Sequence, residues 1–209
     1  MSTSLPSIVS IVLAAGESRR MGTPKLFLPI QGSSMLRRAV AAVAGLGITV
    51  VVTGAYDKEV REHLADIDHL DFAYNAEWRT GMASSIAVGV KAVTTSQPDG
   101  YLIMVADQPS IDLESLAEHL DTFRLCPDAI IATWYPERLG VPAIFPARFT
   151  EDLLSGEGSR GARQLIAQEG EAVKVIRFKE PPKDIDTPED YRRITSGSDQ
   201  TSLTTDDPS

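Results

Sequence analysis

The sequence contains little cysteine and histidine, which excludes several kinds of site. Its 209 residues include one cysteine, Cys126, so no disulfide can form within the chain. The three histidines, His63, His69 and His119, do not have the spacing of a zinc motif. Few cysteines are typical of a reducing compartment, so we expect a cytoplasmic protein. We interpret Cys126 as a packing residue, because no histidine near it in the sequence would activate a thiol.

Long apolar runs and an excess of positive charge are also missing. No run approaches the roughly 20 apolar residues that span a bilayer, and the first residues lack the positive segment of a signal peptide. The formal net charge is −9 at pH 7, whereas proteins that bind nucleic acids or anionic membranes usually carry a basic surface. We therefore expect no nucleic-acid or membrane partner. A small phosphorylated ligand is compatible with this charge, because it needs only a local group of cations and backbone N–H groups.

The chain alternates between β-branched runs and amphipathic segments, which is typical of repeated β–α units. Strands are predicted at 8–13, 48–53, 71–75, 101–106, 129–133, 142–145 and 173–178, and helices at 34–44, 57–64, 84–93, 113–123, 148–154, 160–168 and from 188. This order predicts a three-layer α/β/α, Rossmann-like domain with a mostly parallel sheet. The length fits a single domain over residues 1–195. Residues 196–209, rich in Ser, Thr and Asp, are predicted to be a disordered tail.

The loop after the first strand carries the strongest functional signal. It consists of Leu13-Ala14-Ala15-Gly16-Glu17-Ser18-Arg19-Arg20-Met21-Gly22-Thr23-Pro24-Lys25. Open α/β sheets bind ligands at the carboxyl ends of their strands, and small residues let the backbone N–H groups approach phosphate oxygens. Arg19, Arg20 and Lys25 would neutralise a triphosphate. The alternative is an ordinary turn with solvated basic residues.

Two other kinds of phosphate loop are excluded by the same segment. It has no Gly-Lys-Ser/Thr in P-loop spacing and no Gly-x-Gly-x-x-Gly dinucleotide fingerprint. A nicotinamide-dependent oxidoreductase is therefore suggested only by the α/β pattern, and fold analogy is weak evidence of function.

The segment Leu13–Lys25 resembles the nucleotide-binding signature of the MobA-like nucleotidyltransferases. The resemblance extends from about Val9 to Tyr191, most similar to the molybdenum cofactor cytidylyltransferase branch. Its later motifs are Asn75-x-x-Trp78-x-x-Gly81-Met82-Ala83-Ser84-Ser85, Ala106-Asp107-Gln108-Pro109, Gly140-Val141-Pro142-Ala143-Ile144-Phe145, Gly161-Ala162-Arg163 and Asp184-Ile185-Asp186-Thr187-Pro188-Glu189-Asp190. It implies a sheet of the nucleotide-diphospho-sugar transferase type, and transfer of CMP from CTP to a molybdopterin-type cofactor with release of pyrophosphate.

The resemblance also implies the residues of the active site. Lys25, Arg19 and Asp107 would be catalytic, and Asp107 and Asp186 would hold Mg²⁺, or Mn²⁺ in its place. From the residues alone, a turn or cap role is favoured for Asp107, and whether Asp184 or Asp186 completes the metal site is open. The nucleotide-binding residues implied are Leu13, Ala14, Ala15, Gly16, Arg19, Lys25, Asn75, Gly81, Ser84 and Ser85. Ser84 and Ser85 are also suited to capping a helix, and we assign no chemistry to Trp78.

Pro142 and Arg163 are implied to face the acceptor. The sequence departs from many relatives by Ser159 after Gly158, and from some by Val141 in place of histidine. Both departures concern the acceptor more than the nucleotide. Guanylyl transfer, another phosphorylated acceptor, and a non-catalytic molybdenum cofactor carrier or insertion chaperone are therefore alternatives. A molybdoenzyme or its chaperone is the expected protein partner.

Overall fold

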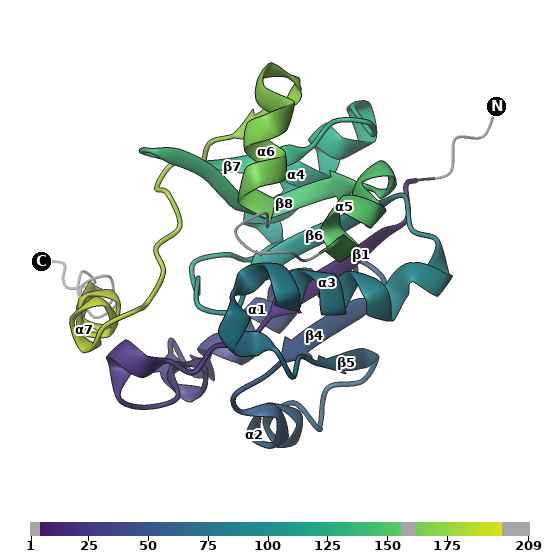
Figure 1. Ribbon diagram of the computed structural model, residues 1–209. Coiled ribbons are helices and arrows are strands. Elements are labelled where there is room, and N and C mark those ends of the chain that lie inside the picture. The colour runs from purple at the N-terminus through teal and green to yellow at the C-terminus, as the bar shows by residue number, and fades with distance from the viewer. Residues whose placement is uncertain (1–4, 156–161, 198–209) are drawn as a thin grey trace, which may run out of the picture.

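A computed structural model describes residues 5–155 and 162–197, which form a seven-stranded sheet covered by helices on both faces (Figure 1). The strands lie in the order β5-β4-β1-β6-β8-β7-β9. All pairings are parallel except those of β8, which runs antiparallel to β6 and β7. The strands are β1 (Ile8–Leu13), β4 (Thr49–Thr53), β5 (Leu70–Tyr74), β6 (Gly100–Val105), β7 (Ile131–Tyr135), β8 (Arg138–Pro146) and β9 (Lys174–Ile176).

Two apolar cores lie on opposite faces of the sheet because side chains alternate along each strand. Val12 of β1 packs with α1, α2 and α4 on one face, whereas Ile11 packs with α3, α5 and α6 on the other. These helices are α1 (Met35–Val43), α2 (Asp57–His63), α3 (Met82–Val93), α4 (Leu113–Leu125), α5 (Thr150–Ser155) and α6 (Ala162–Glu169). The predicted three-layer, mostly parallel α/β/α fold is confirmed.

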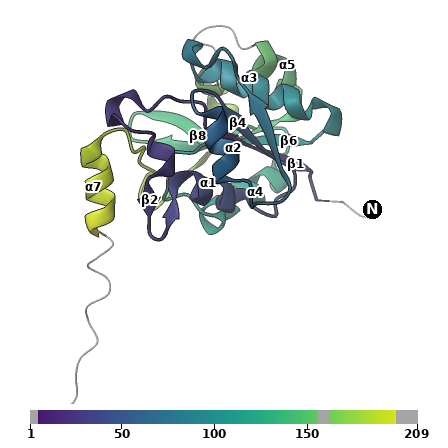
Figure 2. The same ribbon diagram turned by 90° about the horizontal axis from the view of Figure 1, so that it is seen from below.

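The last helix, α7 (Pro188–Gly197), lies beside the N-terminal part of the chain rather than on the sheet (Figure 2). Tyr191 and Ile194 pack against a small buried cluster formed by Met21, Ile30, Met35 and Ile185. The Tyr191 hydroxyl donates a hydrogen bond of 2.7 Å to the carbonyl of Pro29 in the hairpin β2 (Pro29–Ile30) and β3 (Ser33–Ser34). This packing brings the segment before α7 to the edge of the sheet where β1 and β6 end.

The predicted elements are present with shifted boundaries. Helix α3 begins at Met82, two residues before the predicted start, and β8 begins at Arg138, four residues before the predicted start, because its first half pairs with β7. Helix α7 extends to Gly197, so residues 196–197 belong to a helix and not to the predicted tail. Residues 198–209, together with Gly158, Ser159, Arg160 and Gly161, lie outside the described residues. Among the described residues, no helix is both long enough and apolar enough to cross a membrane.

Candidate functional site

A cavity of about 410 Å³ opens at the carboxyl ends of β1 and β6. Leu13 at the end of β1 pairs with Val105 at the end of β6, so the first loop and Asp107 leave neighbouring strands at the same edge. The cavity is lined by Leu13, Ala14, Gly16, Glu17, Ser18, Arg19, Arg20, Lys25, Leu26, Trp78, Arg79, Asp107 and Asp186. Its position is the one that open α/β sheets use for ligands.

The first loop is held in a fixed, partly strained conformation. Ser18 has a left-handed backbone with φ of 56°, and its Oγ accepts a 3.2 Å hydrogen bond from the backbone N–H of Lys25. The Tyr56 hydroxyl donates to the carbonyl of Glu17 at 2.9 Å. Gly54 permits the close approach of this loop, because a Cβ there would lie 2.6 Å from the carbonyl oxygen of Ala15. Such strain in a non-glycine residue is typical of ligand-binding segments.

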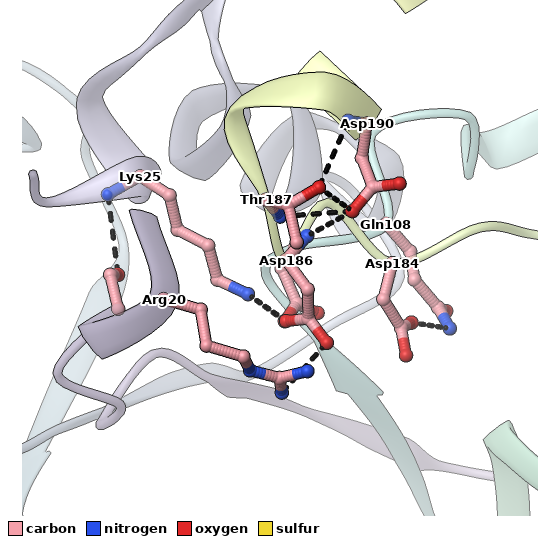
Figure 3. Close-up of polar contacts among 9 residues, drawn as sticks. Arg20, Lys25, Gln108, Asp184, Asp186, Thr187 and Asp190 are labelled. Carbon is pink, nitrogen blue, oxygen red and sulfur yellow. Dashed lines mark hydrogen bonds and ion pairs between the residues drawn. The ribbon is translucent and has the colours of Figure 1, made fainter. Parts of the chain in front are cut away.

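Lys25 joins the two carboxylates that the resemblance implies for the metal. Its Nζ lies 2.7 Å from Asp107 Oδ2 and 2.9 Å from Asp186 Oδ1. Arg20 Nη2 lies 2.9 Å from the other oxygen of Asp186 (Figure 3). The Lys25 side chain is only 12% exposed, so these charges interact in partly desolvated surroundings.

The N-terminal end of α7 positions Asp186 so that its side chain faces the cavity. Thr187 caps the helix: its Oγ1 accepts from the Asp190 N–H at 3.2 Å, while Asp190 Oδ2 accepts from the Thr187 N–H at 2.9 Å. Ile185, fully buried, donates its N–H to the carbonyl of Asp107 at 3.1 Å and anchors the segment. Asp184 accepts from Gln108 Nε2 at 2.8 Å (Figure 3). Asp186 is therefore the carboxylate beside Lys25, and Asp184 faces Gln108.

The two central charges shift each other's proton affinity. Burial alone would lower the pKa of Lys25, but its ion pairs with Asp107 and Asp186 outweigh burial and raise it. Burial raises the pKa of Asp107, and repulsion from Asp184 and Asp186 adds to this rise while Lys25 opposes it. Lys25 is therefore a permanent cation at neutral pH, and the ionised Asp107 depends on a nearby positive charge.

The carboxylates fit a divalent cation that also binds phosphate. Asp107 Oδ1 is buried and has no hydrogen-bond partner in the described part of the chain, so this oxygen of the carboxylate is available to a metal ion. Within the described residues there is no group of three or more His, Cys, Asp or Glu side chains that would hold a metal by themselves. Mg²⁺ is commonly held by one or two carboxylates together with substrate phosphates. Asp107 and Asp186 match that requirement, provided that the phosphates attract Lys25.

A second, smaller cavity of about 130 Å³ shares Asp107 with the first. The Tyr135 hydroxyl donates to the carbonyl of Val141 at 2.6 Å and accepts from Gln108 Nε2 at 2.9 Å. Burial raises the pKa of Tyr135 to about 12, so the hydroxyl keeps its proton. The lining residues are Met82, Val105, Asp107, Gln108, Tyr135, Arg138, Gly140, Val141, Ala162, Arg163 and Asp184.

Most of the predicted site residues are brought together, but Ala15 is not among the residues that line the first cavity, and neither is one group after β5. Asn75 is 1% exposed, and its side-chain amide donates to the hydroxyls of Ser84 and Ser85 at 2.9 Å each. Its Oδ1 accepts from the Glu77 N–H at 2.9 Å. The predicted nucleotide ligands Asn75, Gly81, Ser84 and Ser85 therefore hold the turn before α3 together and are not among the residues that line the cavity.

The two predicted acceptor residues also differ in position. Arg163 lines the second cavity. Pro142 is buried beneath it, and its carbonyl accepts a 2.7 Å hydrogen bond from Thr133 Oγ1. Pro142 therefore shapes the cavity wall without lining it.

Several lining residues were missed by the sequence analysis. Trp78 and Arg79 stand in the first cavity, and Tyr135 and Arg138 in the second. Trp78 belongs to the motif that begins at Asn75. A single aromatic residue in a loop has no periodicity, however, that distinguishes a ligand-binding role from packing. Tyr135 and Arg138 face each other across the β7–β8 turn, where no motif marked them.

An α/β/α fold with a cation-rich loop after β1, Asp107 at the end of β6 and Asp186 before α7 defines a nucleotidyltransferase of the nucleotide-diphospho-sugar transferase fold. The chain matches the MobA-like NTP transferase domain over residues 10–173 and belongs to that family. The family resemblance of the sequence motifs is thereby confirmed.

Relatives within the family have different names. The chain is 29% identical to the purine catabolism protein PucB of Bacillus subtilis, covering 90% of this chain and 96% of PucB. It is 28% identical to the nicotine blue oxidoreductase of Paenarthrobacter nicotinovorans, covering 92% of this chain and 98% of that protein. It is 23% identical to the molybdenum cofactor cytidylyltransferase of Escherichia coli, over 90% and 95%.

Solved structures agree with the fold. The crystal structure of Rv0371c from Mycobacterium tuberculosis superposes with a TM-score of 0.78 at 28% identity, covering 92% of this chain and all of that one. A second structure of Rv0371c, a complex with manganese, superposes with a TM-score of 0.74 at 26% identity, over 91% and 98%.

Proposed function

We propose that the protein transfers CMP from CTP to the terminal phosphate of a molybdopterin-type acceptor and releases pyrophosphate. The observation that carries this proposal is the position of Asp107, which lines both cavities. A nucleotide in the first cavity and an acceptor in the second would meet at this carboxylate. Productive contact between two bound substrates is a large part of the catalysis of a group transfer.

The transfer needs no covalent intermediate on the protein. An oxygen of the acceptor phosphate would form a bond to the α-phosphorus of CTP, and the bond from that phosphorus to the β-phosphate oxygen would break. A phosphate monoester has a second pKa of about 6, so the attacking oxygen is ionised at neutral pH and no general base is required. Mg²⁺, or Mn²⁺, held by Asp107 and Asp186 would supply positive charge to the phosphate oxygens.

The side chains of the first cavity would bind and orient the nucleotide. Leu13, Ala14 and Gly16 line this cavity. The small side chains of Ala14 and Gly16 would let the backbone approach the triphosphate. Lys25 and Arg19 would neutralise the charge that develops on pyrophosphate. Arg163, at the second cavity, would bind the acceptor.

A second candidate keeps the transfer and changes the acceptor or the base. PucB and the nicotine blue oxidoreductase are more similar to the chain than the cytidylyltransferase is. Val141, which departs from the histidine of some relatives, lines the second cavity. Another phosphorylated acceptor, or GTP as donor, would fit the same carboxylates.

A non-catalytic carrier that delivers the cofactor to a molybdoenzyme or its chaperone is a further alternative. Lys25 and Asp107 favour turnover over this role, because simple carriage does not require a charged pair at the junction of two cavities.

The test is pyrophosphate release by purified protein with molybdopterin-type cofactor, Mg²⁺, and CTP, GTP or ATP in parallel. We expect release with CTP, and a loss of about a hundredfold or more in Asp107→Asn, which removes the charge and keeps the shape. Asp128→Asn, at an exposed turn, is the matched control.

Release with GTP alone would support nucleotidyl transfer but would overturn CTP as the donor. Tight binding of the cofactor without release by any triphosphate would favour the carrier. Binding and oxidation of NADPH, measured in the same preparation, would favour an oxidoreductase.

A further inference from the structure

The cations that line the first cavity differ in one respect: whether a carboxylate already holds them. Lys25 is paired with Asp107 and Asp186, and Arg20 with Asp186. Arg19 is paired with Glu17 at 2.6 Å. Arg79 lines the same cavity, and within residues 5–155 and 162–197 it has neither an ion pair nor a hydrogen bond. Arg79 is therefore the cation that a ligand can bind without breaking an existing pair.

Arg79 is held in place by an aromatic ring. Its guanidinium carbon lies 4.1 Å from the centre of the Trp78 ring, a cation–π geometry. This contact with the ring uses no N–H hydrogen bond, so the donors of the guanidinium are available to bind an anion. Those donors form a fork that matches two oxygens of a phosphate group.

The base of this stack is rigid. Trp78–Thr80 forms a short helical turn, closed by a 3.4 Å hydrogen bond from the Gly81 N–H to the Trp78 carbonyl. The Cβ of Trp78 lies 2.8 Å from where a Cβ on Gly54 would stand, so Gly54, directly after β4, packs closely against the base of the Trp78 side chain. The buried Asn75 amide ties the same turn to α3. A cation on such a support loses little side-chain entropy when it binds.

We propose that Arg79, positioned by Trp78, binds the β- and γ-phosphates of the nucleoside triphosphate and retains them as pyrophosphate leaves. The inference rests on the proposed function only for the identity of the ligand as a triphosphate. Arg79 is absent from the lining of the second cavity, where Arg138 and Arg163 stand instead, so it serves the donor nucleotide and not the acceptor. Trp78 is a positioning residue that acts through Arg79.

The test is calorimetric titration of the full-length protein with inorganic pyrophosphate, and separately with phenyl phosphate as a plain phosphate monoester. Arg79→Met keeps the length of the side chain and removes the charge. We expect its pyrophosphate affinity to fall at least tenfold, as for the loss of a charged hydrogen bond. The affinity should also depend less steeply on salt. Arg138→Met, which alters the second cavity, should leave pyrophosphate binding unchanged.

Variants of Trp78 test the positioning role separately. Trp78→Phe retains an aromatic face and should keep most of the affinity, whereas Trp78→Leu should lose much of it. In the Arg79→Met background, Trp78→Leu should have little further effect, because the residue acts through the arginine. Thermal melting of each variant shows that the protein is folded.

Unchanged pyrophosphate affinity in Arg79→Met would overturn the proposal, and so would an equal loss in Arg138→Met, because that would indicate a general effect of charge. A loss confined to phenyl phosphate would overturn it too and assign Arg79 to the acceptor. Pyrophosphate binding needs no turnover. If Arg79→Met weakens pyrophosphate binding but the protein transfers no CMP, the proposed function fails and the inference stands. If the protein transfers CMP but Arg79→Met binds pyrophosphate as tightly as the wild type, the inference fails and the proposed function stands.

Discussion

Replacing Lys25 by methionine should change the affinities for metal and for triphosphate in opposite directions. In the ligand-free protein the Lys25 ammonium lies 2.7 Å from Asp107 and 2.9 Å from Asp186, between the two proposed metal ligands. A divalent cation therefore has to compete with an internal monovalent one. Phosphates would relieve this competition by attracting Lys25 to themselves.

The magnitudes follow from the charges. Two unit charges about 4 Å apart interact with about 4 kcal/mol at an effective dielectric constant near 20. Solvent weakens the repulsion between the Lys25 ammonium and a bound divalent cation, because the Asp186 side chain is 31% exposed. We expect Lys25→Met to tighten Mn²⁺ binding by about tenfold or more without nucleotide, since tenfold is about 1.4 kcal/mol. The lost phosphate contact, about 1.5–3 kcal/mol, should weaken CTP binding by about ten- to a hundredfold.

The assay is an electron paramagnetic resonance titration of free Mn²⁺ in the absence of nucleotide, followed by calorimetric titration of CTP. Lys58→Met, whose side chain is 83% exposed, is the control for loss of one positive charge. Weaker or unchanged Mn²⁺ binding in Lys25→Met would refute the competition. Equal tightening in Lys58→Met would show that the overall charge, and not the position of Lys25, is responsible.

Three further predictions concern stability. Burial lowers the pKa of His119 from 6.5 to about 4. The unfolded chain therefore takes up a proton that the folded protein does not, and stability that is complete above pH 6.5 should fall by about 3 kcal/mol towards pH 4. Urea unfolding of His119→Gln should lack this loss. For Asp57, hydrogen bonds from a threonine and an arginine outweigh burial and lower the pKa, so Asp57→Asn should be less stable than the wild type at pH 7 and approach it as the pH falls below about 3.8. Gly54→Ala should cost about 1–3 kcal/mol in a urea melt, because its Cβ would lie 2.6 Å from a carbonyl oxygen.

Each of these outcomes has a control within the chain. His69→Asn alters an exposed histidine and should retain the pH dependence of the wild type. Equal stability of Asp57→Asn and the wild type at every pH would contradict the role of its hydrogen bonds. Gly16→Ala, where a Cβ has no heavy atom within 4 Å, should cost much less than Gly54→Ala.

The strands and their mostly parallel pairing could be predicted from the sequence, but their order in the sheet and the direction of one strand were not. Ile8–Leu13 is apolar apart from Ser10, and Tyr101–Val105 is a run of large apolar residues, as expected for strands that are covered on both faces. The antiparallel course of β8 was not predicted. Strand direction depends on the partner that a strand finds, and the charge of Arg138 and the glycine at position 140 conceal the half of β8 that pairs with β7.

The location of the candidate site was also predictable, because its two main parts follow strands. The first loop and Asp107 come directly after β1 and β6, whose parallel pairing brings them to one edge. The ligand roles expected for Asn75, Ser84 and Ser85 stay predictions, and in the ligand-free structure their side chains bond one another. A polar side chain in a loop is compatible with binding a ligand and with binding its own backbone, and burial distinguishes the two only after folding.

The sequence alone was sufficient to determine the succession of strands and helices along the chain, the phosphate-type loop and the family, because each rests on motifs whose residues are close together in the chain. Only the tertiary structure decided which late carboxylate faces Lys25, since the buried Ile185 orients Asp184 and Asp186 through packing against distant residues. It also decided that Lys25 pairs with carboxylates 82 and 161 positions away, and that Arg79 has no such partner among the residues that the structure describes. Contacts across such separations are set by packing of the whole domain and leave no local pattern.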